Sequence, residues 1–237
     1  MLCVSRSLVS GLLLALVLGV PTGSVSAGPI FFGPTPYLST ADIPTGFYSG
    51  GSPTGLENFE GGTLGFGITA SGGGVIGPGF FTDSVDADDG VIDGFGRNGH
   101  SFFAPLNVLT FTFPTPVTAA GLVFTDAETG AIVSFEAFGP GMVSLGGLGP
   151  YSNLFLGPTT GETAEDRFFG VQDLGGIIAL RVTTNIANGS NQGLEIDHLQ
   201  FGNAAVAAVP EPGSLTLLAI GGLGVVGWIR RRNRVKA

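Results

Sequence analysis

Glycine and proline punctuate this chain so closely that its central part shows no sustained helical period. The sequence has 42 glycines and 15 prolines in 237 residues, and both are unfavourable inside a helix. Between them lie short runs in which apolar and polar residues alternate, a pattern typical of β-strands. Leu109, Phe111 and Phe113 alternate with threonines, and Pro114 and Pro116 end the run. With turn signals about every eight to twelve residues, the pattern predicts an all-β fold.

Further alternating runs cover residues 120–124, 133–135, 178–182 and 194–201. The 19 phenylalanines and a hydrophobic content of 43% supply enough apolar surface for a core. A chain of this kind can offset the entropy of ordering, which argues against disorder. We therefore expect a single β-sandwich domain, jelly-roll-like in arrangement, over residues 56–203.

The charge of the chain excludes one class of partner. Acidic residues number 18 and basic residues 9, and charged residues make up only 11% of the sequence. A nucleic-acid-binding protein needs a basic surface. Between the two terminal segments the only basic residues are Arg97, Arg167 and Arg181. We therefore expect no nucleic-acid partner.

The N-terminus is typical of a secretory signal peptide. Arg6 provides a positive charge, residues 8–20 are apolar, and Ala27 ends a small-residue cleavage site. The apolar run is too short to span a bilayer comfortably, so we expect residues 1–27 to be removed. Residues 28–55, rich in glycine, proline, serine and threonine, predict an extended lead-in to the domain.

The C-terminus has three parts in a fixed order. Pro210, Glu211 and Pro212 come first, an apolar stretch over residues 214–229 follows, and a basic tail occupies residues 230–236. The stretch is short for a bilayer, but a tryptophan and long basic side chains at its end can reach the interface. We expect a single transmembrane helix with its basic end in the cytoplasm, because positive residues are retained inside.

This order of Pro-Glu-Pro, apolar helix and arginine cluster resembles the PEP-CTERM sorting signal of bacteria with a Gram-negative-type envelope. The resemblance covers about 28 residues from Pro210 onward, within the linker and sorting signal expected over residues 204–237, and does not extend to the body. It implies recognition of Pro210, Glu211 and Pro212 by an exosortase, a membrane-embedded cysteine protease or transpeptidase. It also implies transient anchoring in the inner membrane, then transfer to the cell surface or to an extracellular matrix such as that of a biofilm.

Five aspartates crowd a short segment around Gly90, and hard oxygen ligands around a glycine turn are what Ca²⁺ requires. An EF-hand that started at Asp86 would place Val91 at the glycine position and Arg97 at the last ligand position, so the segment is not an EF-hand. A calcium loop and a solvated acidic turn both remain open. The aspartates are Asp83, Asp86, Asp88, Asp89 and Asp93.

Glu60 and Asp197 form a second candidate metal pair. In many jelly-roll carbohydrate-binding modules, which the body resembles weakly, a structural calcium lies between the first and last strands. Glu195 and Asp197 share one strand face, yet Leu199 continues that parity with an apolar residue, which predicts a bulge near His198. The alternative is that these acids are exposed near a strand end.

The sequence offers no catalytic motif, so we expect no enzymatic activity. It lacks a histidine–zinc motif and a nucleophile elbow, and we interpret His100 and His198 as structural. Residues 94–99 fit a dinucleotide-binding glycine pattern, but no helix is expected after them. The adjacent pair Glu165 and Asp166, or Glu195 with Asp197, leaves a carboxylate-dependent glycoside hydrolase open as a third hypothesis.

The sequence thus predicts an exported surface or matrix protein with a structural or adhesive body. The alternative is a calcium-assisted module that binds extracellular polysaccharide, with aromatic rings stacked on sugars. The rings considered for that role are Phe80, Phe81, Phe102, Phe103 and Tyr151.

Overall fold

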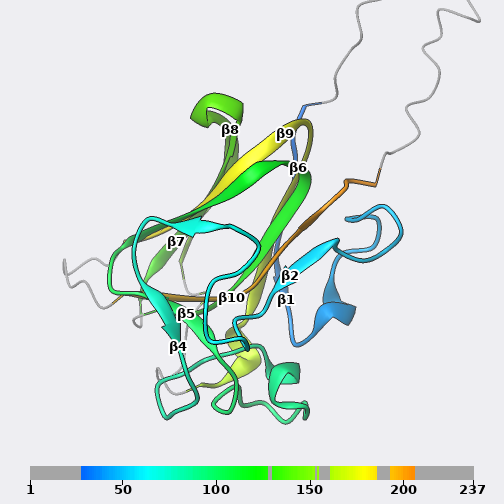
Figure 1. Cartoon of the computed structure of the whole chain (residues 1–237). Helices are drawn as coiled ribbons and strands as arrows, with labels where there is room; N and C mark the ends of the chain where they lie inside the picture. The colour runs from blue at the N-terminus through cyan, green and yellow to red at the C-terminus, as the bar shows by residue number, and fades with distance from the viewer. Residues whose placement is uncertain (1–27, 128–129, 153, 155–160, 186–192, 206–237) are drawn as a thin grey trace, which may run out of the picture.

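The computed structural model describes residues 28–127, 130–152, 154, 161–185 and 193–205. These residues form β-strands, turns and a few short 3-10 helices, so the all-β prediction is confirmed (Figure 1). Within these ranges, no helix has the length and apolar character needed to cross a membrane. The predicted signal peptide, sorting motif and transmembrane segment lie outside the described residues.

The strands and helices follow one another in this order along the chain. The strands are β1 (Ile30–Pro36), β2 (Gly55–Glu57), β3 (Thr69–Ala70), β4 (Gly74–Ile76), β5 (Ser101–Ala104), β6 (Val108–Ala127), β7 (Ile132–Gly139), β8 (Val143–Ser152), β9 (Arg167–Asn185) and β10 (Leu194–Gly202). The short 3-10 helices are η1 (Thr40–Asp42), η2 (Asp86–Asp89), η3 (Pro140–Met142) and η4 (Thr163–Glu165).

Hydrogen bonds join the strands into one antiparallel sheet, in the order β4-β5-β10-β6-β9-β7-β8. In addition, β1 pairs with β9, β2 with β10 and β3 with β6. The two longest strands, β6 and β9, run through the whole arrangement (Figure 1). The first part of β6 pairs with the end of β9, and the last part of β6 pairs with the start of β9. These strands therefore connect two halves of the sheet.

The prolines of β6 interrupt its pairing but do not end it, contrary to the expectation from the sequence. Pairing with β9 is irregular between Thr112 and Val117, the stretch that contains Pro114 and Pro116. Proline has no N–H to donate to a neighbouring strand, so the regular ladder fails there. The chain stays extended, however, and one strand carries on to Ala127.

The segment expected to be a lead-in contributes to the sheet. Residues of β1 pair with the start of β9, Ile30 opposite Gln172. Tyr37 and Phe47, which follow β1, are fully buried.

The pairing partners also place the ends of β1 and β10. Gln172, the partner of Ile30, lies opposite Ala119, and Ala119 lies opposite Gly202. The start of β1 and the end of β10 are thus at the same end of the sheet.

The main hydrophobic core lies between the two halves of the sheet. Phe135 of β7 stacks on Phe169 near the start of β9, with ring centroids 5.7 Å apart. These rings belong to different halves, since β7 pairs with the end of β9. Leu109, Phe111 and Phe113 all face this core, as their alternation predicts.

A bulge in β10 changes which side chains face the core. Leu194 and Ile196 belong to the core, and after the bulge Leu199 takes over. The pairing register with β6 shifts between Asp197 and Gln200, and His198 has a φ of 42°. The bulge predicted near His198 is therefore confirmed.

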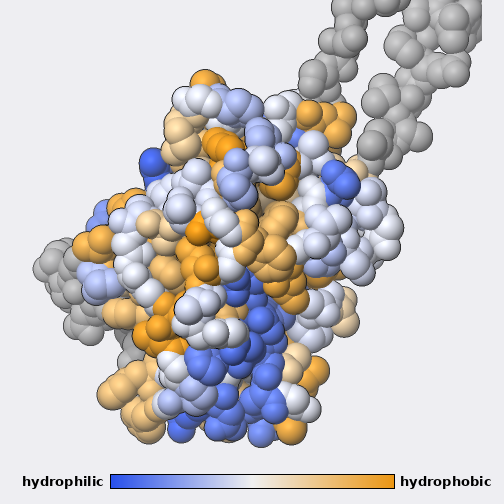
Figure 2. All heavy atoms as spheres, viewed as in Figure 1, coloured by the Kyte–Doolittle hydropathy of each residue, from blue (hydrophilic) through white to orange (hydrophobic). Residues whose placement is uncertain are grey.

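A second, smaller hydrophobic cluster covers part of the opposite face. Tyr37, Phe47 and Tyr48 pack there against Val123 and Phe168 of the central strands. In the view of Figure 2, hydrophilic side chains gather around the loop that contains η2. That loop, residues 77–100, connects β4 to β5 and carries the five aspartates.

Candidate functional site

The candidate site includes two acidic residues from neighbouring strands, which lie on the face of the sheet away from the main core. Glu195 of β10 lies directly opposite Asp126 of β6. Such a like-charge pair across two strands is unfavourable when both groups are ionised. The side chains are also buried, with 3% of Glu195 and 6% of Asp126 exposed. These two buried acids therefore need hydrogen bonds, protons or positive charge from other parts of the protein.

The β4–β5 loop covers these acids and is held by them. The backbone N–H of Asp83 donates to Glu195 Oε1 at 2.8 Å, and that of Val85 donates to Asp197 Oδ2 at 2.7 Å. The Ser101 hydroxyl also donates to Glu195 Oε1. The carboxylates thus satisfy backbone groups of the loop that would otherwise be buried without partners.

Five of the buried acids in this region have a raised pKa, and we call them the acid layer. Their exposed fractions range from 0% to 6%. They come from the loop, from β6, from the residue before β9 and from β10, so the fold assembles them from distant parts of the chain. The members are Asp83, Asp126, Asp166, Glu195 and Asp197.

Burial raises the pKa of every member of the acid layer. The pKa of Asp126 rises to about 8, with the charge of Glu195 adding to the effect, and that of Glu195 rises to about 7. Asp83, Asp166 and Asp197 have pKa values well above the usual range for aspartate. Because desolvation disfavours the charged form, the layer favours protonation or a bound cation.

Asp86 has a structural role within the β4–β5 loop. Its carboxylate accepts hydrogen bonds from the backbone N–H groups of Asp93 and Gly94, both at 3.0 Å. It also accepts one from the Thr163 hydroxyl at 2.9 Å. Asp86 therefore fixes the far side of the loop and ties it to η4.

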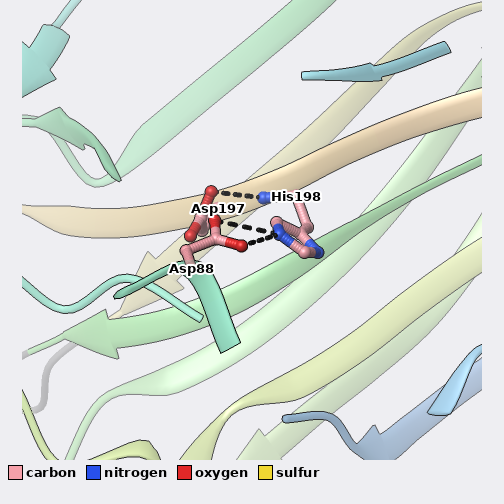
Figure 3. A group of neighbouring side chains, drawn as sticks. All are labelled: Asp88, Asp197 and His198. Atoms are coloured by element: carbon pink, nitrogen blue, oxygen red, sulfur yellow. Dashed lines mark hydrogen bonds and ion pairs between the residues drawn. The ribbon is translucent and has the colours of Figure 1, made fainter. Parts of the chain in front are cut away.

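Asp88, Asp197 and His198 form the one group of metal-ligating side chains that the described residues bring within 4.8 Å of one another (Figure 3). His198 Nε2 lies 2.8 Å from Asp88 Oδ1, and His198 Nδ1 lies 2.9 Å from the Tyr37 hydroxyl. A carboxylate accepts hydrogen bonds, so His198 Nε2 donates to Asp88, and the Tyr37 hydroxyl is the partner of Nδ1. Both ring nitrogens of His198 thus have partners.

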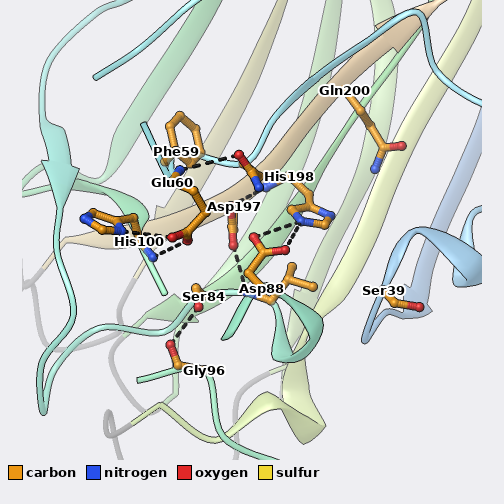
Figure 4. A network of polar contacts seen from close by, with 12 residues as sticks. Ser39, Phe59, Glu60, Ser84, Asp88, Gly96, His100, Asp197, His198 and Gln200 are labelled. Carbon is orange, nitrogen blue, oxygen red and sulfur yellow. Dashed lines mark hydrogen bonds and ion pairs between the residues drawn. The ribbon is translucent and has the colours of Figure 1, made fainter. Parts of the chain in front are cut away.

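Glu60 binds His100, next to this group (Figure 4). Its carboxylate accepts a hydrogen bond from the His100 backbone N–H at 2.6 Å and lies 3.1 Å from His100 Nδ1. Burial is the main cause of the raised pKa of Asp197, to which Asp88 and then Glu60 add. Glu60 is not a member of the group of Asp88, Asp197 and His198, and both Glu60 and Asp197 accept hydrogen bonds from other residues.

The remaining aspartates of the β4–β5 loop close local turns. Asp89 accepts from the backbone N–H of Val91 and from the side chain of Asn98. Asp93 accepts from the backbone N–H of Phe95. The five loop aspartates therefore divide between turn formation, the hydrogen bond to His198 and the acid layer.

Sequence patterns did not identify Asp126 or Ser101 as parts of a site. Asp126 has the same parity as the core residues Leu122 and Phe124, and only a register shift between β6 and β10 places it opposite Glu195, which alternation does not predict. The two carboxylate pairs considered for hydrolysis, in contrast, both contribute to the layer, through Asp166 and through Glu195 with Asp197.

Two further candidates are explained by packing. Gly96, within the glycine pattern at residues 94–99, lies so close to Ser84 that a Cβ atom would overlap the Ser84 carbonyl. Its glycine is required by this close approach. Phe102, considered for sugar stacking, is a core residue with 3% of its surface exposed.

Comparison with known proteins gives information on the C-terminus. A family model described as the PEP-CTERM protein-sorting motif matches residues 208–232, which include Pro210, Glu211 and Pro212. No curated protein and no solved structure matches the chain significantly. Residues 208–232 thus carry a PEP-CTERM sorting motif, and this motif implies export, exosortase processing and association with the membrane.

Proposed function

We propose that this chain is an exported structural or adhesive protein of the bacterial surface or extracellular matrix. The observation that carries the proposal is the sorting motif at residues 208–232. In this proposal the signal peptide is removed after Ala27 and residues 214–229 hold the precursor in the inner membrane, with the basic tail in the cytoplasm. Exosortase then acts near Pro210, Glu211 and Pro212, and the body reaches its final surface location.

The chemistry of the motif agrees with processing by a protease. Proline at 210 and at 212 disfavours a helix over the glutamate between them. A segment kept extended in this way fits a protease active site, which binds its substrate without helical structure. We therefore assign recognition to the three residues of the motif and anchoring to the apolar stretch that follows.

Replacement of Pro210, Glu211 and Pro212 by alanine tests the sorting proposal. We expect the triple variant to accumulate as full-length precursor in the membrane fraction of its natural host, detected by immunoblotting. The control is Pro78→Ala, at an exposed position of the body, which should be processed normally. Normal release of the triple variant would contradict the proposal.

We propose that the body is a sandwich of jelly-roll type without enzymatic activity. The stacking of Phe135 on Phe169 across the two halves supports a sandwich. The acids considered for hydrolysis support a structural role instead, because Glu195 and Asp197 accept hydrogen bonds from the backbone of the covering loop. Their exposed fractions of 3% and 0% leave little surface for a substrate.

Exposed aromatic rings favour a second candidate function, calcium-assisted binding of a polysaccharide. Phe80 and Phe81 are 58% and 71% exposed and contact each other edge to face. The Arg97 guanidinium lies 4.9 Å from the centroid of the Phe80 ring. Flat, exposed rings of this kind can stack on sugars.

A polysaccharide array tests this second function. We expect Phe80→Ser with Phe81→Ser to abolish binding, and chelator to weaken it. The control is Phe66→Ser, at a ring that is 54% exposed but packs on Phe201 instead. Equal binding by all variants would exclude the Phe80–Phe81 surface as a glycan site.

A further inference from the structure

Asp197 and His198 are neighbours in β10, yet both point away from the main core. Consecutive residues of a regular strand point to opposite faces of the sheet. Here Ile196 and Leu199, which flank the two residues, belong to the core. The bulge makes this possible, because the register with β6 shifts between Asp197 and Gln200 and His198 has a φ of 42°. One strand therefore brings a carboxylate and an imidazole to the same place.

The β4–β5 loop adds a second carboxylate to this place, that of Asp88 in η2. One ligand atom from each of Asp88, Asp197 and His198 lies within 4.8 Å of the other two (Figure 3). His198 Nε2 is 2.8 Å and 3.0 Å from the two oxygens of Asp88. The group is almost closed to solvent, since Asp197 is 0% exposed and the Asp88 side chain is 9% exposed. The structure thus shows two carboxylates and an imidazole that converge in a buried position.

Behind the imidazole, a buried acceptor has no hydrogen-bond partner. Gln200 is 0% exposed, and its side-chain oxygen is unpaired. Its Nε2 lies 3.4 Å from the Tyr37 hydroxyl, which in turn lies 2.9 Å from His198 Nδ1. Buried polar groups are almost always paired, so this exception requires an explanation.

A second arrangement of the same groups pairs this acceptor. A half-turn of the Gln200 amide exchanges its oxygen and nitrogen, so that the Tyr37 hydroxyl can donate to the oxygen. The Tyr37 oxygen then accepts a hydrogen bond from His198 Nδ1–H. In this arrangement the ring carries its proton on Nδ1, and the lone pair of Nε2 points at Asp88. The Nε2 proton that Asp88 accepts in the other arrangement is the group that a metal ion would replace.

A histidine in this state is prepared to bind a metal. Metal-ligating histidines almost always donate their other ring N–H to an oxygen, which fixes the orientation of the ring. Backbone groups orient Asp197 in the same way, because the N–H of Val85 donates to one oxygen at 2.7 Å and that of His198 donates to the other at 2.6 Å. Each carboxylate oxygen can accept more than one contact. These hydrogen bonds therefore hold Asp197 in place and leave its oxygens able to bind an ion.

We propose that Asp88, Asp197 and His198 bind Zn²⁺ between η2 and the bulge of β10. Imidazole nitrogen and carboxylate oxygen are both zinc ligands, and three protein ligands leave a fourth position for water. Ca²⁺ takes oxygen ligands, so the imidazole selects against it. Two ionised carboxylates and a neutral imidazole carry two negative charges, which a divalent ion neutralises. The ion would join the β4–β5 loop to the last strand of the sheet.

Calorimetric titration with ZnCl₂ tests the site. Full-length protein is purified in detergent, freed of metal with chelator and dialysed before the titration. We expect one zinc ion per chain, which an equal concentration of CaCl₂ does not displace. Loss of a hydrogen bond that orients a ligand weakens metal binding by about 10- to 100-fold, so Asp88→Asn and His198→Gln should weaken it at least as much. X-ray absorption at the zinc edge should show nitrogen and oxygen ligands at about 2.0–2.2 Å.

Two further variants sharpen the test. His100→Gln is the matched control, because His100 Nδ1 also lies close to a carboxylate, 3.1 Å from Glu60 Oε2, but is outside the group. This variant should bind zinc as the wild type does. Tyr37→Phe keeps all three ligands and removes only the acceptor for Nδ1–H. It should bind zinc about tenfold or more weakly.

Thermal unfolding in EDTA and in zinc separates a metal site from a simple hydrogen bond between His198 and Asp88. Asparagine keeps an acceptor for His198, so Asp88→Asn should fold and can be compared directly with the wild type. Zinc should raise the unfolding temperature of the wild type, and raise that of Asp88→Asn much less. A wild type that does not respond to zinc, or an equal rise in both proteins, would overturn the proposal. Loss of binding in His100→Gln with normal binding in His198→Gln would also overturn it, because the ion would then lie at Glu60.

Discussion

Both faces of β10 are buried, but one face carries apolar side chains and the other carries carboxylates. Leu194 and Ile196 face the main core, and Glu195 and Asp197 face the β4–β5 loop. Each of the four is at most 3% exposed. Burial alone therefore does not distinguish a hydrophobic core from a polar site in this protein. The difference lies in what covers each face, which is the other half of the sheet on one side and loop backbone on the other.

The two faces should respond to different perturbations. The core face is stabilised by removal of apolar surface from water, which depends little on pH or on divalent cations. The acid face depends on the protonation of buried carboxylates, and therefore on pH. Variants and solution conditions that affect one face and spare the other test this distinction.

The largest effect is expected in the core. Phe169 is fully buried between β7 and the central strands, so Phe169→Ala should reduce the free energy of unfolding by about 3–5 kcal/mol. Urea denaturation measures the loss, which should be the same in calcium and in EDTA. Phe66→Ala, at a ring that is 54% exposed, is the control. A calcium-dependent loss for Phe169→Ala would mean that the two faces are coupled.

A smaller effect is expected when metal-free protein is taken through neutral pH. The pKa values of Asp126 and Glu195 are raised in the folded protein to about 8 and about 7. The folded state therefore holds more protons than the unfolded state, and this stability is present at low pH and lost as pH rises toward 8. Thermal unfolding in EDTA should show a falling midpoint from pH 5 to pH 8.

The variant Asp126→Asn provides the control for the pH experiment. It removes one of the titrating groups of the acid layer, so its midpoint should fall less steeply over the same range. A wild-type midpoint that rises between pH 5 and pH 8 would contradict the protonation of the acid layer in the metal-free protein.

The smallest effect concerns the loop that covers the acid face. Asp86→Ala removes the acceptor for Asp93, Gly94 and Thr163, and should cost about 1–3 kcal/mol. The loop should also become easier to cut with protease at Phe95. Asp93→Ala loses a single turn contact and should stay close to the wild type. Equal protease resistance in all three proteins would show that the loop does not depend on Asp86.

Local patterns in the sequence predicted the strand class, the core face of several strands and the bulge near His198. These three features are short-range properties, because each depends on the alternation of apolar and polar residues over a few positions. The continuation of β6 past Pro114 and Pro116 was not predicted. A proline prevents pairing at its own position, but the neighbouring strand β9 keeps the chain extended on both sides of the break.

The acid layer depends on contacts between distant parts of the chain. The alternation of apolar and polar residues along the sequence does not predict such contacts. Asp83 and Glu195, which are far apart in the sequence, come together because the β4–β5 loop covers β10 and the Asp83 N–H donates to the Glu195 carboxylate. The sequence showed that Glu195 and Asp197 share a strand face, but it did not show that a loop covers that face. The alternative that Glu195 and Asp197 are exposed near a strand end is therefore wrong, since both are buried.

The position of β10 also has a mechanical consequence. This last strand lies inside the sheet, with β6 on one side and β2 and β5 on the other. Tension applied from the C-terminal side enters at Gly202 and runs along the strand axis. It therefore loads the hydrogen bonds of three neighbouring strands together, in shear, where an edge strand would peel away one bond at a time.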